Sequence, residues 1–188
     1  ILDINSGSEL TNLMKTVNQL LDEAIIIENS YHELTLIENT RYVVGRLDLK
    51  PRGFGFLIPN DPSKNDVFIN KTNLNGAMNN DIVLVHLEKF SFSVRQEGMI
   101  KRVLERKSSH LIGVLMHRNG MGYLETDDRS INRDVVIKQH NLNNAKKFDV
   151  VRCQIVNYSY KGKIEAKVTD ILGNKNDAGV DILSKILK

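Results

Sequence analysis

Aromatic and basic side chains gather in two short segments, residues 50–56 and 66–71. Phe54 and Phe56 are two residues apart, and the glycines at 53 and 55 add no side chain that could cover them. Because residues two apart on a strand point to the same face, both rings would project together, and Phe68 could join them from a neighbouring strand. Unpaired bases stack on such rings, at about 1–3 kcal/mol per base. The candidate residues for this surface are Phe54, Phe56, Phe68, Lys50, Arg52 and Lys71.

The same phenylalanines have a structural alternative, which is burial in a hydrophobic core. However, Leu57 and Val67 occupy the alternate positions and already supply an apolar inward face. A core role for the phenylalanines would require a strand that is apolar on both faces inside a small barrel. We therefore favour the stacking interpretation.

The elements that must position these residues form an internal repeat. Strands are expected over 42–49, 53–59, 66–70, 81–89 and 98–106, and again over 111–118, 121–127, 134–138, 149–158 and 164–172. Gly45 and Gly113 are 68 residues apart, as are Asp81 and Asp149, and GFGF at 53–56 meets GMGY at 120–123 with a one-residue gap. Five short strands leave exposed edges unless the sheet closes on itself. The sequence predicts a mainly β protein with two tandem five-stranded barrels.

The second copy keeps fewer of the candidate residues. Tyr123 is its clear stacking candidate, with Arg118 nearby, whereas Val136 replaces the aromatic residue at the position of Phe68. We expect this barrel either to guide a nucleic-acid strand by charge or to pack against its neighbours, and direct contact by Tyr123 is left open.

A helix and a hairpin are expected before the first barrel. Apolar residues recur at three- and four-residue steps over 8–24, and Ser6 with Glu9 has the spacing of a capping box. Short strands at 25–27 and 34–37 would follow. This order is typical of the second half of a winged helix, or of a generic helix-plus-hairpin cap.

Charge is distributed unevenly along the chain. The 188 residues have a net charge of +3, but residues 1–44 hold two basic and seven acidic side chains, and the remainder holds 24 basic and 16 acidic ones. The net positive charge of residues 45–188 is compatible with a phosphate-containing partner. The single cysteine, Cys153, excludes an internal disulfide and favours a cytoplasmic location, with its thiol buried. No apolar run approaches the roughly 20 residues of a membrane span, so we expect no membrane partner.

The other candidates for chemistry are weak. The five histidines and Cys153 show no metal-ligand spacing, and no glycine-rich loop has the ending of a phosphate-binding loop. We interpret Asp127 and Asp128 as turn residues. Arg102, Arg106 and Lys107, like Lys146 and Lys147, are interpreted as solvated surface residues, with contact to phosphate as the alternative. We expect no catalytic residue, metal or cofactor in this chain.

Two sets of residues resemble known families. KPRGFGFLIP with DVFIN resembles the paired RNA-binding motifs of cold-shock domains, which are OB-type barrels. The order of helix and hairpin, GRLDLKPRGFGFLIP, second barrel and VTDILGNKNDAGVDILSKIL resembles the N-terminal region of bacterial ribonuclease R, a family of ribonuclease II-type 3′→5′ exoribonucleases. The resemblance implies a partial winged helix at 1–41, cold-shock domains at 42–106 and 110–173, and a linker or helix at 174–188. It further implies that a catalytic domain, with aspartates that hold Mg²⁺, follows the second barrel and is absent from this chain.

These observations predict a non-catalytic module that binds single-stranded RNA for a ribonuclease R-like enzyme, with other RNA-decay proteins as further candidate partners. Two alternatives remain open, a stand-alone RNA chaperone and a protein–protein adaptor. In the adaptor, the barrel faces would bind protein instead of RNA.

Overall fold

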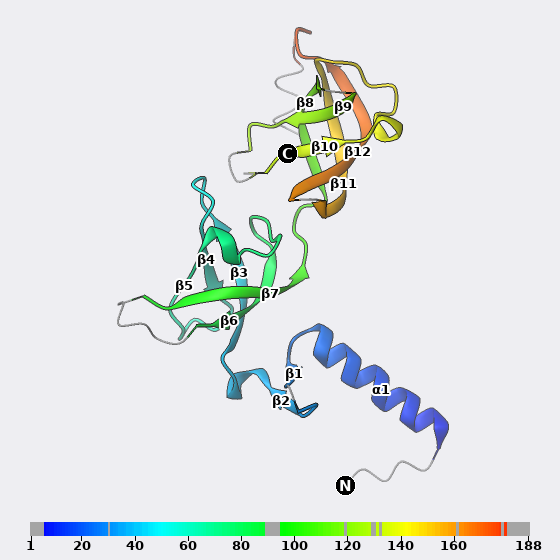
Figure 1. The fold of residues 1–188 in the computed structure, drawn as a ribbon. Helices are drawn as coiled ribbons and strands as arrows, with labels where there is room; N and C mark the ends of the chain where they lie inside the picture. The colour runs from blue at the N-terminus through cyan, green and yellow to red at the C-terminus, as the bar shows by residue number, and fades with distance from the viewer. Residues whose placement is uncertain are drawn as a thin grey trace. The chain divides into compact units, whose positions relative to one another are not determined.

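The chain forms two compact units, each described separately below. The computed structural model describes residues 6–29, 31–88, 95–118, 120–128, 131, 133–160, 162–177 and 179. The first unit comprises Ile1–Asp48, Gly55–Asn75 and Asp81–Glu105, and the second comprises Leu49–Phe54, Gly76–Asn80 and Arg106–Lys188. Figure 1 shows the order of the elements along the chain.

Helix α1 (Gly7–Asp22) begins at the predicted capping box. The Ser6 hydroxyl accepts a hydrogen bond from the Glu9 amide at 3.2 Å, and the Glu9 carboxylate accepts one from the Ser6 amide at 3.0 Å. Strands β1 (Ile26–Glu28) and β2 (Leu34–Leu36) then pair as an antiparallel hairpin, with Ile27 opposite Thr35. The predicted helix and hairpin are both confirmed.

The first barrel contains β3 (Tyr42–Leu49), β4 (Gly55–Pro59), β5 (Val67–Ile69), β6 (Ile82–Leu87) and β7 (Glu97–Glu105). These strands close in the order β3-β4-β5-β7-β6, because β6 pairs back onto β3. Short 3-10 helices precede β3 (Ile37–Asn39) and follow β5 (Lys71–Asn73). The fully buried core side chains alternate along the strands and include Leu47, Leu57, Ile69, Val83, Val85 and Ile100.

The second barrel repeats this arrangement with β8 (His110–Arg118), β9 (Met121–Glu125), β10 (Val135–Ile137), β11 (Asp149–Tyr160) and β12 (Lys163–Asn174). The closed order is β10-β12-β11-β8-β9, and a 3-10 helix (Gln139–Asn141) follows β10. Its core includes Leu115, Ile137, Val151, Cys153, Ile164 and Ala166. The predicted fold class, two closed five-stranded barrels in a mainly β chain, is confirmed.

The two barrels share cross-strand pairs as well as strand order. Phe56 lies opposite Phe68 in the first barrel, and Tyr123 lies opposite Val136 at the equivalent place in the second. Each barrel also contains one parallel pair, β5 with β7 and β10 with β12, which the sequence pattern did not indicate. The repeat in the sequence is therefore a repeat of the fold.

The first strand of each barrel has a glycine at the equivalent position, Gly45 in β3 and Gly113 in β8. At both positions the neighbouring backbone leaves no room for a side chain. A Cβ atom at Gly45 would overlap the carbonyl group of Ile58, and one at Gly113 would overlap the carbonyl group of Glu125. Close approach of one backbone to another requires glycine, because any other residue would force the strands apart.

The helical tail expected over 178–188 lies, except for Gly179, outside the described residues. In the part of the chain that is described, no helix is long and apolar enough to cross a membrane. Cys153 is fully buried, as predicted.

Candidate nucleic-acid interface

Phe56 and Phe68 form an aromatic pair on the outer side of the first barrel. The two residues are directly opposite on β4 and β5, and their ring centroids are 5.8 Å apart with the planes at 63°, an edge-to-face contact. Both side chains are half-buried, whereas Leu57, Val67 and Ile69 at the alternate positions are buried. The rings therefore lie on the face opposite the core, as the alternation predicts, and remain partly accessible.

Phe54 lies in a turn before the strand. The amide of Gly53 donates a hydrogen bond to the Lys50 carbonyl oxygen at 2.8 Å, and the Lys50 amide donates one to the Phe54 carbonyl oxygen at 2.8 Å. Gly53 has φ +87°, a left-handed conformation outside the β region, and β4 begins at Gly55 and not at 53 as expected. Phe54 is half-buried at the end of this turn.

Arg95 contacts the aromatic pair, although its position in the sequence does not single it out. Its guanidinium carbon lies 4.7 Å from the centroid of the Phe56 ring and 5.5 Å from that of Phe68. These distances are within the range of cation–π interactions. The parallel pairing of β7 with β5 places Glu97 opposite Phe68, and so brings the residues just before β7 alongside the rings. A pairing of this kind leaves no periodic signal in the sequence.

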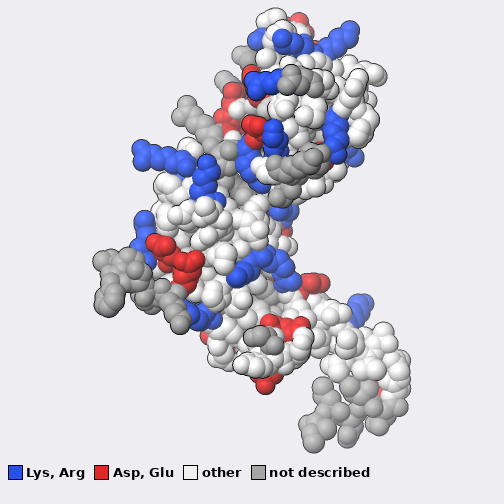
Figure 2. All heavy atoms as spheres, viewed as in Figure 1, with Lys and Arg blue, Asp and Glu red and all other residues white. Residues whose placement is uncertain are grey.

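The other predicted residues of the first barrel are distributed over both units. Lys50 and Arg52 lie with Phe54 in the Leu49–Phe54 segment of the second unit, and Arg52 is exposed. Lys71 is exposed and begins the 3-10 helix directly after β5, in the first unit. Figure 2 shows Lys and Arg side chains on both barrels, interrupted by acidic groups on the face in view.

In the second barrel, the structure brings Tyr123 and Arg118 together. Tyr123 is half-buried on β9, and the guanidinium carbon of Arg118 lies 5.8 Å from its ring centroid. The Lys163 ammonium group, which the sequence pattern does not select, lies 5.3 Å from the same centroid and pairs with Asp134 at 3.1 Å. The residue opposite Tyr123 is Val136, which is buried and has no aromatic ring. This cross-strand pair therefore offers one ring, whereas the equivalent pair of the first barrel offers two.

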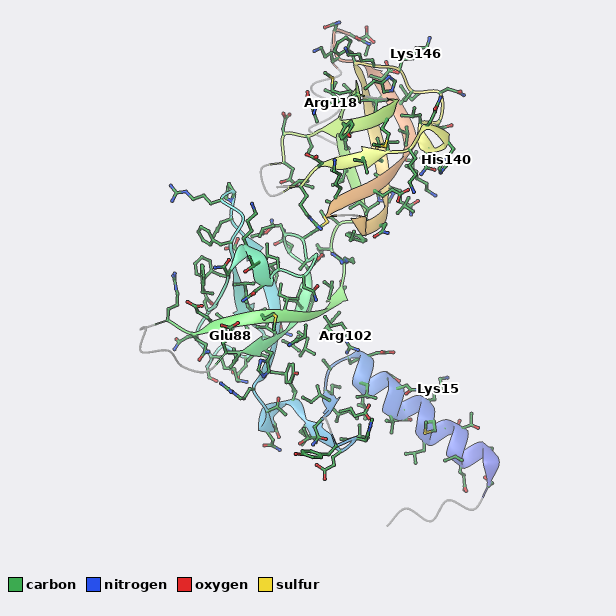
Figure 3. The ribbon with its side chains drawn as sticks, in the orientation of Figure 1. Lys15, Glu88, Arg102, Arg118, His140 and Lys146 are labelled. Atoms are coloured by element: carbon green, nitrogen blue, oxygen red, sulfur yellow. The ribbon has the colours of Figure 1, made fainter. Side chains whose placement is uncertain are left out.

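Two arginines that were interpreted as solvated surface residues also have structural partners, although Arg102 is exposed, as expected, and Arg106 is half-buried. Arg102 donates hydrogen bonds to the carbonyl oxygens of Leu21 and Asp22 at the end of α1, where carbonyl groups lack a donor within the helix. Figure 3 shows Arg102 beside this end of the helix. Arg106 lies 3.7 Å from the centroid of the Tyr158 ring and donates to the Gly76 carbonyl oxygen at 3.0 Å. Neither is part of the candidate surface.

Burial shifts the pKa of two side chains. Loss of hydration, followed by the positive charges of Lys101 and Arg41, lowers the pKa of His86 below its usual 6.5. The His86 ring also packs edge-on against Tyr42, with centroids 4.9 Å apart. Burial raises the pKa of the Cys153 thiol to about 12, which makes this cysteine unreactive as a nucleophile.

The described residues do not fit the Mg²⁺ site of a nuclease. No group of three His, Cys, Asp or Glu side chains lies close enough together within the described ranges to hold a metal ion. Asp127 and Asp128 are both exposed, and Asp128 lies in a turn in which its amide donates to the Thr126 hydroxyl at 3.2 Å and its carbonyl oxygen accepts from the Ile131 amide at 3.0 Å. Exposed turn carboxylates of this kind support no metal-dependent step.

Comparison with known proteins matches both barrels. The family model for the Ribonuclease B OB domain matches residues 45–103, and that for the cold shock domain matches residues 123–188. Ribonuclease R from Thermotoga maritima is 31% identical over 147 residues, which cover 77% of this chain and 20% of the relative. The chain thus spans about a fifth of that relative's length.

Solved structures show the same fold. RNase R from Mycoplasma genitalium, in complex with ribose methylated single-stranded RNA, has a TM-score of 0.68 at 20% identity and covers 77% of this chain and 24% of its own. Yeast Ssd1, described as a pseudonuclease, has a TM-score of 0.65 at 16% identity, covering 79% of this chain and 25% of its own.

The tandem barrels and the outward aromatic pair define an OB-fold protein of the cold-shock type. Together with the matches to both barrels, they place the chain in the ribonuclease R family, where it corresponds to the N-terminal region.

Proposed function

We propose that this chain binds single-stranded RNA and presents it to the catalytic part of a ribonuclease R-like exoribonuclease. The observation that carries the proposal is the pairing of Phe56 and Phe68 on the outer face of β4 and β5, next to the guanidinium group of Arg95. Two half-buried rings beside a cation can receive bases on their faces and phosphate groups at their edge. The RNA-bound structure of Mycoplasma genitalium RNase R, which shares this fold, supports RNA as the ligand class.

Stacking determines the expected selectivity. Bases in a duplex are already stacked and paired, so their faces are not free to contact aromatic side chains. Every base has a face of this kind, and stacking therefore discriminates little between sequences. The module should prefer single strands over duplexes and show a weak sequence preference.

RNA hydrolysis, Mg²⁺ binding and contacts with other RNA-decay proteins are proposed for the parent enzyme and not for these residues. The support is family membership, because the described residues do not provide an acidic cluster. A cytoplasmic location is proposed on the same basis, together with the single buried thiol.

The two alternatives make different predictions. Yeast Ssd1 has this fold and is described as a pseudonuclease, so an RNA-binding role without cleavage is compatible with the architecture. A stand-alone chaperone would bind RNA as proposed but would have no nuclease domain in its natural chain. A protein–protein adaptor would lose partner binding, and not RNA binding, when Phe54 is replaced by alanine.

The test is a fluorescence anisotropy titration with a labelled single-stranded oligonucleotide, in which the wild type is compared with a triple variant, Phe54→Ala, Phe56→Ala and Phe68→Ala. We expect the folded triple variant to lose several kcal/mol of binding free energy, up to about 3 kcal/mol for each stacked base. Equal affinities for the two proteins would refute the stacking platform and favour the adaptor.

A further inference from the structure

The loop before β11 differs in composition from its counterpart in the first barrel. At the offset of 68 residues, Lys146, Lys147 and Phe148 take the places of Met78, Asn79 and Asn80. The flanking sequences NLNGA and NLNNA are otherwise nearly identical, and an aspartate follows in both cases. The second barrel therefore has two lysines and a phenylalanine at the place where the first has a methionine and two asparagines.

The backbone of this loop makes phenylalanine an unexpected choice. Asn80 has φ +66°, and Phe148 has φ +75° at the equivalent position, so both adopt the left-handed conformation. Asparagine tolerates this region, whereas for a bulky side chain it is a genuine outlier. Residues held in such conformations cluster at binding sites, where the surrounding structure imposes the strain.

Hydrogen bonds on both sides hold Phe148 in this conformation. Its amide donates to the Leu115 carbonyl oxygen at 2.8 Å, and its carbonyl oxygen accepts from the Lys175 amide at 2.9 Å. The carboxylate of the next residue, Asp149, accepts from the Lys146 amide at 2.7 Å. The loop thus presents the aromatic side chain from a fixed backbone.

Two ammonium groups lie over the Phe148 ring. The Lys147 nitrogen is 4.7 Å from the ring centroid and the Lys175 nitrogen is 4.6 Å from it. Both lysines are exposed, and the ring is half-buried. Lys146 is also exposed, and Figure 3 shows it on the same loop, directed away from the barrel. The two like charges beside one ring repel each other and attract an anion such as a phosphate group, and an ammonium group that turns to a phosphate group uncovers the ring for a base.

We propose that Phe148, Lys147 and Lys175 form a second contact site for single-stranded RNA, with a base on the Phe148 ring and phosphate groups on the two lysines. The inference rests on the proposed function and adds a site on the second barrel, where the face of Tyr123 lacks a second ring. The two lysines favour a polyanion over a protein surface, because a protein interface core is depleted of lysine.

The most informative variant is Phe148→Asn, which installs the residue that the first barrel has at this position. Because asparagine tolerates positive φ, the variant should be at least as resistant to chemical denaturation as the wild type. Its affinity for a labelled single-stranded oligouridylate long enough to reach both barrels should fall about tenfold. A purely structural role for Phe148 predicts no change in affinity.

A second variant keeps the proposal testable should Phe148→Asn fail to fold. The double variant Lys147→Gln and Lys175→Gln should lower the slope of log affinity against log salt by about 1.4, since each lost phosphate contact on a single strand contributes about 0.7. An unchanged salt dependence of the affinity would refute the proposed contacts of Lys147 and Lys175 with phosphate groups.

The two proposals fail in different ways in this experiment. If the wild type does not bind the oligonucleotide, the proposed function is refuted, and the second site with it. If the wild type binds, the triple phenylalanine variant of the first barrel binds more weakly, and Phe148→Asn binds like the wild type, then the second site alone is refuted. That last result would leave Phe148 with a purely structural role in the second barrel.

Discussion

Replacing Phe68 by valine tests the aromatic pair with a substitution that the fold already uses. Valine occupies the equivalent position 136, where it pairs with Tyr123 in the same antiparallel register. The change removes the edge-to-face contact with Phe56, at a cost of about 0.5–1.5 kcal/mol in the free energy of unfolding beyond the loss of buried area. It also removes one stacking ring, worth about 1–3 kcal/mol of binding free energy, or about 5- to 150-fold in affinity.

Anisotropy titration with a labelled single strand gives the affinity, and urea denaturation of the same preparations gives the stability. Tyr31→Ala is a suitable control, because Tyr31 is 82% exposed but lies between Glu28 and Glu33, where the charge opposes RNA. The control should bind like the wild type. A folded Phe68→Val protein with unchanged affinity would refute the reasoning.

Three further predictions concern stability and reactivity. Gly113→Ala should lower the free energy of unfolding by about 1–3 kcal/mol or more, because the new methyl group overlaps the Glu125 carbonyl group. The control Gly7→Ala should not destabilise the protein, because there is open space around Gly7. Equal effects of the two substitutions in urea denaturation would contradict the close approach of the backbone at Gly113. Because the pKa of His86 is lowered, the unfolded chain binds more protons as the pH falls below about 6.5, and stability is lost over that range. His86→Gln should therefore show a smaller loss of unfolding free energy between about pH 7 and pH 5, and an identical pH profile would contradict the lowered pKa of His86. Cys153 should react with a thiol reagent at the rate of unfolding, and fast labelling of the native protein at about pH 8 would contradict its raised pKa.

The barrels were predictable because alternation and repetition reinforce each other. Leu57 and Val67 mark the inward face, and the equivalent pairs 56/68 and 123/136 keep one register in both copies. The capping box at Ser6 and Glu9 likewise fixed the start of α1, since both hydrogen bonds depend on residues three apart in sequence.

The parts that were missed depend on tertiary contacts or on backbone conformation. Arg95 reaches the rings through the parallel pairing of β5 and β7, which joins segments without a shared period. Arg102 finds its acceptors at the end of α1, about 80 residues away in sequence. The role proposed for Phe148 depends on its positive φ. A phenylalanine in the sequence gives no indication of this backbone conformation, which bulky residues rarely adopt.

The most direct test of the account compares a labelled single-stranded RNA with a duplex of the same length, titrated with the wild-type chain at two salt concentrations. The account predicts tighter binding to the single strand at both concentrations, because stacking on Phe56 and Phe68 needs free base faces and does not depend on salt. Equal affinity for both RNAs, or a preference for single strands that disappears at high salt, would contradict it and leave charge alone as the basis of binding.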